Sequence, residues 1–351
     1  MNTGKCGLFV SALLAAALPS HAVNLGGTNV PKEKFVVYLL IGHSNMAGED
    51  MRNSDGVTHP NAWHWPIAKK AWQPAKETPN GGRAAGLSGH GEGGPGMPFL
   101  KGLINAYPGY YFGVINNASL SSTCKGENQG NSSSPLDPSD NRYFKDTYLF
   151  KEITDAAKAV QAEATLGGVL CMLGSVEATR TSQAVCEAFS DDLAQLAKDL
   201  RAELGVPNLP FIMGGYENGA TGNFALSKPW PAIIDAQIKL LPSKLPYSGV
   251  VDSKGITMLD DHHYVATGNG QPLWAQRAIA LIQTNNWLPG VTAISPTLSR
   301  TSARTAATAE FRAGTLWFRT WEGSWSADGR SPAGRTSRIA DRASWAPVAE
   351  R

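Results

Sequence analysis

A continuous apolar run covers residues 35–41, Phe-Val-Val-Tyr-Leu-Leu-Ile, and is rich in β-branched and aromatic types. Because no polar residue alternates within it, the run predicts a strand buried on both faces, as in a parallel sheet covered by helices. The pattern breaks at Gly42, so Ser44 follows the carboxyl end of this strand, the edge where open α/β sheets bind ligands. An incidental serine in a strand-to-helix turn is the alternative interpretation.

Apolar runs and helical periodicities alternate along the rest of the chain. The runs predict strands at 111–117, 167–174, 210–214 and 247–252, and the periodicities predict helices at 97–107, 144–164, 190–205, 230–241 and 272–284. This alternation predicts an α/β fold with a doubly wound, mostly parallel sheet flanked by helices. Segment 50–96 is long, polar and dense in Gly, Pro and Trp, and is predicted to be a functional loop without regular structure. Its three tryptophans, at positions 63, 65 and 72, are interpreted as core residues rather than sugar-stacking platforms.

The two ends of the chain differ from its body. Residues 1–22 combine a basic start, an apolar stretch and a small-x-small site, which predicts a secretory signal and a protein exported to the outside or surface of the cell. Residues 23–288 form the predicted domain. Residues 289–351 form an appendage whose part from Leu298 onward holds nine arginines, no lysine and five acidic residues. It includes a predicted hairpin (310–312 and 316–321) and is interpreted as an attachment signal, a sugar-binding flap or a disordered tail.

Net charge bears on the binding partners of the protein, and cysteine content bears on its disulfide bonds. The net charge of +2 argues neither for nor against a polyanionic partner. We expect no nucleic acid partner and no membrane span. The predicted mature chain keeps Cys124, Cys171 and Cys186, an odd number that allows at most one bridge. A Cys171–Cys186 bridge is one alternative, and Cys171 as a core thiol is the other. The sequence leaves the oligomeric state open.

A second polar cluster, Asp260-Asp261-His262-His263-Tyr264, precedes the last predicted helix. A catalytic triad needs a base near the serine hydroxyl and a carboxylate that fixes the imidazole tautomer. The three-residue spacing lets one loop supply both, so Asp260 and His263 form the natural pair. The alternatives are an ordinary polar loop or a metal site formed by the acidic and histidine side chains of the cluster.

The block Gly42-His-Ser-Asn-Met-Ala-Gly48 resembles the Gly-Gln-Ser-Asn-Met-x-Gly block of the sialate O-acetylesterase and acetylxylan esterase group, carbohydrate esterase family six of the SGNH (GDSL-like) hydrolases. The last block of that family, Asp-x-x-His followed by an aromatic residue, matches Asp260, His263 and Tyr264. The resemblance implies a secreted serine esterase without metal or organic cofactor, with Ser44 as nucleophile, His263 as base and Asp260 as its orienting carboxylate. The implied substrate is an acetylated polysaccharide or oligosaccharide, with acetylxylan or a similar plant polysaccharide favoured.

Two middle blocks depart from the family. Leu120 and Ser121 replace the glycines whose amide donates to the oxyanion, so the amides of Ser44 and Ser121 are the expected donors. Leu173 replaces a glutamine that donates through its side chain. A leucine at position 120 would adopt a positive φ only with strain.

The same third block has Ser175 in place of a glutamate, while Glu177 approximates an aspartate. His43 replaces the glutamine beside the nucleophile and is a candidate contact to the oxyanion or the sugar; its alternative role is to pack the turn. Two other functions compete: a non-catalytic carbohydrate-binding or surface protein that kept the fold, and an esterase for another acyl group.

Overall fold

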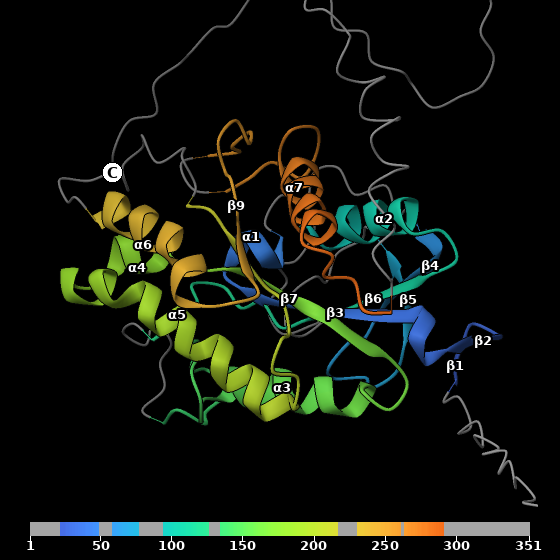
Figure 1. The fold of residues 1–351 in the computed structure, drawn as a ribbon. Helices are drawn as coiled ribbons and strands as arrows, with labels where there is room; N and C mark the ends of the chain where they lie inside the picture. The colour runs from blue at the N-terminus through green and yellow to red at the C-terminus, as the bar shows by residue number, and fades with distance from the viewer. Residues whose placement is uncertain are drawn as a thin grey trace, which may run out of the picture. The chain divides into compact units, whose positions relative to one another are not determined.

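The computed structural model describes residues 22–48, 58–76, 94–125, 134–216, 230–260 and 263–290. At its centre lies a seven-stranded sheet with strand order β5-β4-β6-β3-β7-β8-β9 (Figure 1). The strands are β3 (Phe35–Gly42), β4 (Thr58–His64), β5 (Gln73–Lys76), β6 (Tyr111–Asn116), β7 (Thr165–Met172), β8 (Phe211–Gly214) and β9 (Ser248–Val251). Every neighbouring pair is parallel except β4 with β5. A separate antiparallel hairpin joins β1 (Ala22–Leu25) to β2 (Thr28–Pro31).

Helices cover both faces of this sheet (Figure 1). They are α1 (Ser44–Ala47), α2 (Gly96–Ala106), α3 (Tyr148–Val160), α4 (Ser175–Arg180), α5 (Gln183–Leu204), α6 (Trp230–Lys244) and α7 (Gln271–Thr284), with a short 3-10 helix η1 (Lys32–Lys34). Side chains of α2 and α7 join the core on one face, and side chains of α3, α5 and α6 join the core on the other. The predicted α/β fold with a mostly parallel sheet between two helical layers is confirmed.

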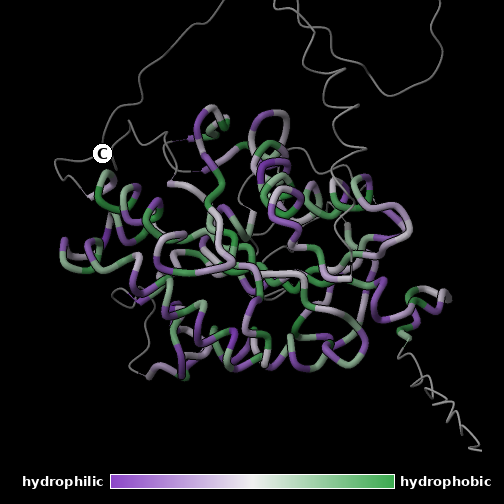
Figure 2. Tube along the Cα trace, in the orientation of Figure 1, coloured by the Kyte–Doolittle hydropathy of each residue, from purple (hydrophilic) through white to green (hydrophobic). Residues whose placement is uncertain are grey.

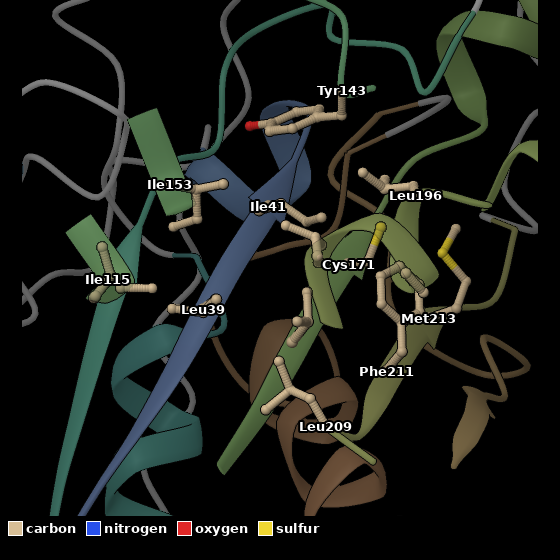
Figure 3. Close-up of a cluster of buried hydrophobic side chains, with 14 of the residues drawn as sticks. Leu39, Ile41, Ile115, Tyr143, Ile153, Cys171, Leu196, Leu209, Phe211 and Met213 are labelled. Carbon is tan, nitrogen blue, oxygen red and sulfur yellow. The ribbon is translucent and has the colours of Figure 1, made fainter. Parts of the chain in front are cut away.

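Strand β3 lies in the middle of the sheet and all eight of its residues are buried. Because side chains alternate along a strand, Leu39 and Ile41 enter the core under α3 and α5, whereas Tyr38 and Leu40 enter the core under α2 and α7. Figure 3 shows Leu39 and Ile41 among side chains from neighbouring strands and from the helices of that layer. Burial on both faces therefore explains the uninterrupted apolar run, and Figure 2 shows the same apolar character along the central strands.

The prediction of a structureless loop over residues 50–96 is wrong for part of that segment. Strand β4 pairs with β6 over residues 62–64 and β5 pairs with β4, so this segment forms one edge of the sheet. The register shift between Thr58 and Trp63 and the proline within β4 obscure the period-two pattern of a strand. Trp63 is buried and Trp72 packs on the core with its Nε1 donating to Glu163, so the interpretation of these tryptophans as core residues is confirmed.

Helix α5 begins earlier than its apolar periodicity predicts. The helix starts at Gln183, where the Ser182 side chain accepts a hydrogen bond from the Val185 amide, rather than at Ser190. Ser190 lies inside the helix, buried, and its hydroxyl donates to Gln237 on α6. The predicted C-terminal cap is confirmed, since Gly205 adopts the left-handed conformation with φ of 67°.

The three cysteines of the body, Cys124, Cys171 and Cys186, are all buried and free. The Cys171–Cys186 bridge is therefore absent, and Cys171 is a core thiol near the carboxyl end of β7, as Figure 3 shows. A position on a fully buried central strand gives a cysteine the role of a small apolar residue.

The chain divides into two units, Met1–Ile294 and Ser295–Arg351, and the second unit lies outside the described residues, as does the hairpin predicted within it. Residues 1–21 of the predicted signal also lie outside them, and Ala22 opens β1. Among the residues with described structure, no helix has the length and apolar character needed to cross a membrane.

Candidate active site

The end of β3 turns sharply into α1 and presents Ser44 at the first position of that helix. Gly42 has a φ of 141°, and a Cβ at this position would lie 2.2 Å from the main-chain oxygen of Met172 on the neighbouring strand. Only glycine allows this approach. The His43 amide then donates to the same Met172 oxygen at 2.9 Å, which ties the turn to β7. Ser44 is thereby held just beyond the carboxyl edge of the sheet, where the sequence predicts it.

Ser44, His263 and Asp260 form a continuous hydrogen-bonded chain. The Ser44 Oγ lies 2.9 Å from His263 Nε2, and His263 Nδ1 lies 2.8 Å from Asp260 Oδ2. Asp260 Oδ1 also accepts from the His263 amide at 2.7 Å. An ionised carboxylate accepts only, so this geometry assigns the imidazole proton to Nδ1 and leaves Nε2 as the acceptor for the serine hydroxyl. The structure thus brings Ser44 to the Asp260–His263 pair, which lies more than two hundred residues away in the sequence.

Asp261 and His262, the other two members of the predicted metal alternative, lie outside the described residues. Within the residues whose placement is described, no group of three or more His, Cys, Asp or Glu side chains is arranged to hold a metal ion.

A second layer of hydrogen bonds joins the serine turn to the histidine loop. Asn45, buried next to the nucleophile candidate, accepts from the Tyr264 amide through Oδ1 at 2.8 Å. Gln271 at the start of α7 donates through Nε2 to the Asn45 main-chain oxygen at 2.8 Å. These bonds tie the main chain next to Ser44 to the main chain next to His263 and to the start of α7. They therefore help to fix the distance between Ser44 and His263. Sequence reasoning did not assign Asn45 or Gln271 a role, because their partners are distant in sequence.

The backbone N–H groups of Ser44 and Ser121 are the predicted oxyanion donors. The Ser119 amide donates to the Gly42 oxygen at 2.8 Å, which brings the turn after β6 beside the serine turn. Within the described part of the chain, neither the Ser44 amide nor the Ser121 amide has a hydrogen-bond partner. The positive φ in this turn falls on Ser121, at 55°, and not on Leu120. The anticipated strain at Leu120 is therefore absent.

Leu173 does not contribute to the site, because it is buried in the apolar core and has no donor. The glutamine donor of the family is thus missing, as its residue type predicts. The predicted oxyanion donors that remain are the two backbone amides.

His43 is engaged within the protein. Its Nδ1 accepts from the Asn45 amide at 3.3 Å, so Nε2 carries the proton and donates to Ser175 Oγ at 3.0 Å. Two departures from the family, at positions 43 and 175, are therefore hydrogen-bonded partners of each other. Because both ring nitrogens of this buried side chain have such partners, the geometry favours the role of packing the turn over the predicted contact with oxyanion or sugar.

Glu177 on α4 is the charged side chain that sequence reasoning undervalued. It is fully buried, with Oε1 accepting from the Cys124 amide at 2.6 Å and Oε2 from the Gly174 amide at 3.0 Å. Burial raises the pKa of Glu177 to about 7, while the backbone hydrogen bonds oppose that rise. The sequence indicated a role for Glu177 only through its place in the third family block, where it approximates an aspartate.

The structure defines the class of protein first: a three-layer α/β fold in which a serine hydroxyl faces an imidazole that a carboxylate orients. Residues 34–278 match the family model described as carbohydrate esterase, sialic acid-specific acetylesterase, and the chain belongs to this family. It is accordingly a carboxylic ester hydrolase with an SGNH-like fold that acts on O-acetylated carbohydrate.

Solved structures show the same fold. The structure resembles that of NanS, with a TM-score of 0.55 and 13% identity over 72% of this chain and 98% of that one. It also resembles a protein from Arabidopsis thaliana, with a TM-score of 0.54 and 18% identity over the same shares of the two chains. No curated protein matches the sequence.

Proposed function

We propose that this protein is a secreted serine esterase that removes O-acetyl groups from carbohydrate through an acetyl-enzyme. The observation that carries the proposal is the hydrogen-bonded chain from Ser44 Oγ through His263 to Asp260. This arrangement supplies a nucleophile, a base in contact with it and a carboxylate that fixes the tautomer, which are the parts that acyl transfer requires.

In the first half-reaction, Ser44 Oγ attacks the acetyl carbonyl carbon while its proton passes to His263 Nε2. The carbonyl oxygen becomes an oxyanion facing the amides of Ser44 and Ser121, and Asp260 stabilises the imidazolium that has formed. The tetrahedral intermediate collapses by breaking the bond to the sugar oxygen, which takes the proton from His263. The free sugar hydroxyl leaves, and the acetyl group remains on Ser44.

In the second half-reaction, His263 Nε2 accepts a proton from water as the water oxygen attacks the acetyl carbon. Collapse of the second intermediate returns the proton to Ser44 Oγ and releases acetate. No residue of the proposed mechanism requires a metal or organic cofactor.

For the substrate, we propose an acetylated plant polysaccharide such as acetylxylan. The proposal draws support from the arginine- and tryptophan-rich segment 289–351, which resembles appendages of secreted plant-fibre-degrading hydrolases. The signal-like pattern of residues 1–22 supports export. N-terminal sequencing of the protein recovered outside the cell is expected to start at Val23.

The test is acetate release from a panel containing acetylxylan, acetylated pectin and an O-acetylated sialic acid, with the Ser44→Ala variant measured in parallel. We expect the greatest kcat/KM on acetylxylan and none above background in the variant. A greatest rate on the sialic acid would refute the substrate proposal and leave the chemistry intact. Without a side-chain donor at position 173, a rate lower than that of relatives by about 10²–10³ is expected. Complete absence of Ser44-dependent turnover would favour the carbohydrate-binding alternative.

A further inference from the structure

A buried carboxylate that the proposed mechanism does not use lies one turn into α4. Glu177 is fully buried, and among the described residues no lysine or arginine pairs with it. Taking an unpaired carboxylate out of water is costly unless hydrogen bonds stabilise it. Here that stabilisation comes from two backbone amides on different segments, Cys124 and Gly174, one for each carboxylate oxygen.

The two amides belong to the turns that flank the serine. Gly174 follows β7 and precedes Ser175, whose hydroxyl meets His43 next to the nucleophile. Cys124 ends the turn after β6 that contains Ser121. Glu177 thus links two turns. One contains Ser121, and the other contains Ser175, which bonds to His43 beside Ser44.

Other side chains hold the 119–124 turn from two sides. On the α4 side, Arg180 Nη1 donates to Ser121 Oγ at 3.2 Å. The Asn141 side chain donates to the Ser121 oxygen at 2.9 Å, and the Thr123 amide donates to the Asn141 oxygen at 3.1 Å. These bonds hold the turn to the segment before α3. Whereas Arg180 bonds to a side chain of the turn, Glu177 accepts from its main chain at Cys124, close to the end of the turn. Glu177 therefore limits the backbone motion that would move the Ser121 amide away from Ser44.

We infer that Glu177 is a positioning residue, whose two backbone hydrogen bonds hold the 119–124 turn so that the Ser121 amide points at the developing oxyanion. The inference rests on the proposed function, because it assigns a role within that reaction. Preorganised amides stabilise the transition state only when their direction is fixed before the reaction. A glutamine cannot replace the carboxylate, since it offers one acceptor and one NH2 donor to two N–H donors.

The ionisable groups around Glu177 are Asp192 on α5 and the thiols of Cys124, Cys171 and Cys186. Asp192 carries like charge and adds to the effect of burial in raising the pKa of Glu177. Lys125, which pairs with Asp192 at 3.7 Å, supplies the neighbouring positive charge. Protonation of Glu177 weakens its acceptance of the two amides, so the turn is held best above neutral pH.

The experiment compares Glu177→Gln with Asp192→Asn, which removes a nearby carboxylate that accepts from neither turn. At pH 8 we expect Glu177→Gln to lower kcat on a small acetyl ester by about 10²-fold with KM changed less than about threefold. Asp192→Asn should retain the kcat of the parent. An unchanged kcat in Glu177→Gln, or an equal loss in both variants, would overturn the inference.

Hydrogen exchange tests the inference without turnover and does not require the Glu177→Gln variant to fold. In the Ser44→Ala protein, the protection factors of the Cys124 and Gly174 amides should fall between pH 8 and pH 6 as Glu177 takes up a proton, while those of β3 stay constant. Constant protection at both amides would refute the role of Glu177. If the parent shows no Ser44-dependent turnover, the proposed function fails on that result alone, and the exchange measurement still decides whether Glu177 holds the turn.

Discussion

The substitution Asp260→Asn tests the orienting role of this carboxylate with the smallest change of shape. Both Asp260 oxygens accept from His263, one from the main-chain amide at 2.7 Å and one from Nδ1 at 2.8 Å. An asparagine in the same position has one oxygen and one NH2 group. If its oxygen keeps the bond to the amide, the NH2 faces Nδ1, which must then become an acceptor.

That change moves the imidazole proton to Nε2, where it opposes the acceptance of the Ser44 proton. The opposite amide orientation places NH2 against the His263 N–H, at a cost of about 1–3 kcal/mol for the unmade bond. A carboxylate that fixes the tautomer in a dry site is worth about 10⁴ in kcat. Because the Asp260 side chain is 43% exposed, water screens part of its charge, and we expect a loss of about 10²–10³ in kcat.

The assay is kcat and KM on a soluble acetyl ester at pH 8, with thermal unfolding measured on the same samples. Asp252→Asn is the matched control, since Asp252 is an exposed aspartate whose Oδ1 accepts from the Lys254 amide in a similar turn. We expect the control to keep the parent rate. A rate for Asp260→Asn within about fivefold of the parent, with the fold intact, would refute the tautomer argument.

Three further predictions concern stability and the appendage. His43→Ala removes a buried ring with two hydrogen bonds, so it should lower the free energy of unfolding by about 2–4 kcal/mol and change kcat little. Urea unfolding and kcat are measured on the same variant. A large fall in kcat without loss of stability would favour the contact with oxyanion or sugar instead. Burial raises the pKa of Glu177 from 4.5 to about 7, so the folded state holds this proton more tightly than the unfolded state. The resulting stability is complete below pH 4.5, and about 3 kcal/mol of it is lost as the pH rises to 7. Glu177→Gln should remove this change from the pH profile of unfolding. Truncation after Leu288 should leave a folded, active esterase, and loss of cooperative melting in the truncated protein would show that the appendage stabilises the domain.

The parts predicted correctly from sequence are those with local signals. The strand β3 is apolar throughout because helices cover both of its faces, and the turn after it needs Gly42 for close approach to Met172. Asp260 and His263 are three residues apart, so one turn suffices to hydrogen-bond them. Each of these features is decided within about ten residues of sequence.

The missed parts depend on contacts between distant segments. Strand β4 is completed by pairing with β6, and its own residues alternate too weakly to indicate a strand. The hydrogen bond from His43 to Ser175 joins residues 132 positions apart, so nothing in the sequence connects the two substitutions before the fold brings the side chains together. Glu177 likewise acquires its partners only in the folded chain.

Mass spectrometry of the protein, quenched with acid during turnover of an activated acetyl ester, tests directly whether Ser44 is the acylated nucleophile. We expect one added acetyl group on the peptide that contains Ser44, and no such group in Ser44→Ala. An acetyl group on a different residue, together with undiminished turnover in Ser44→Ala, would show that Ser44 is not the nucleophile.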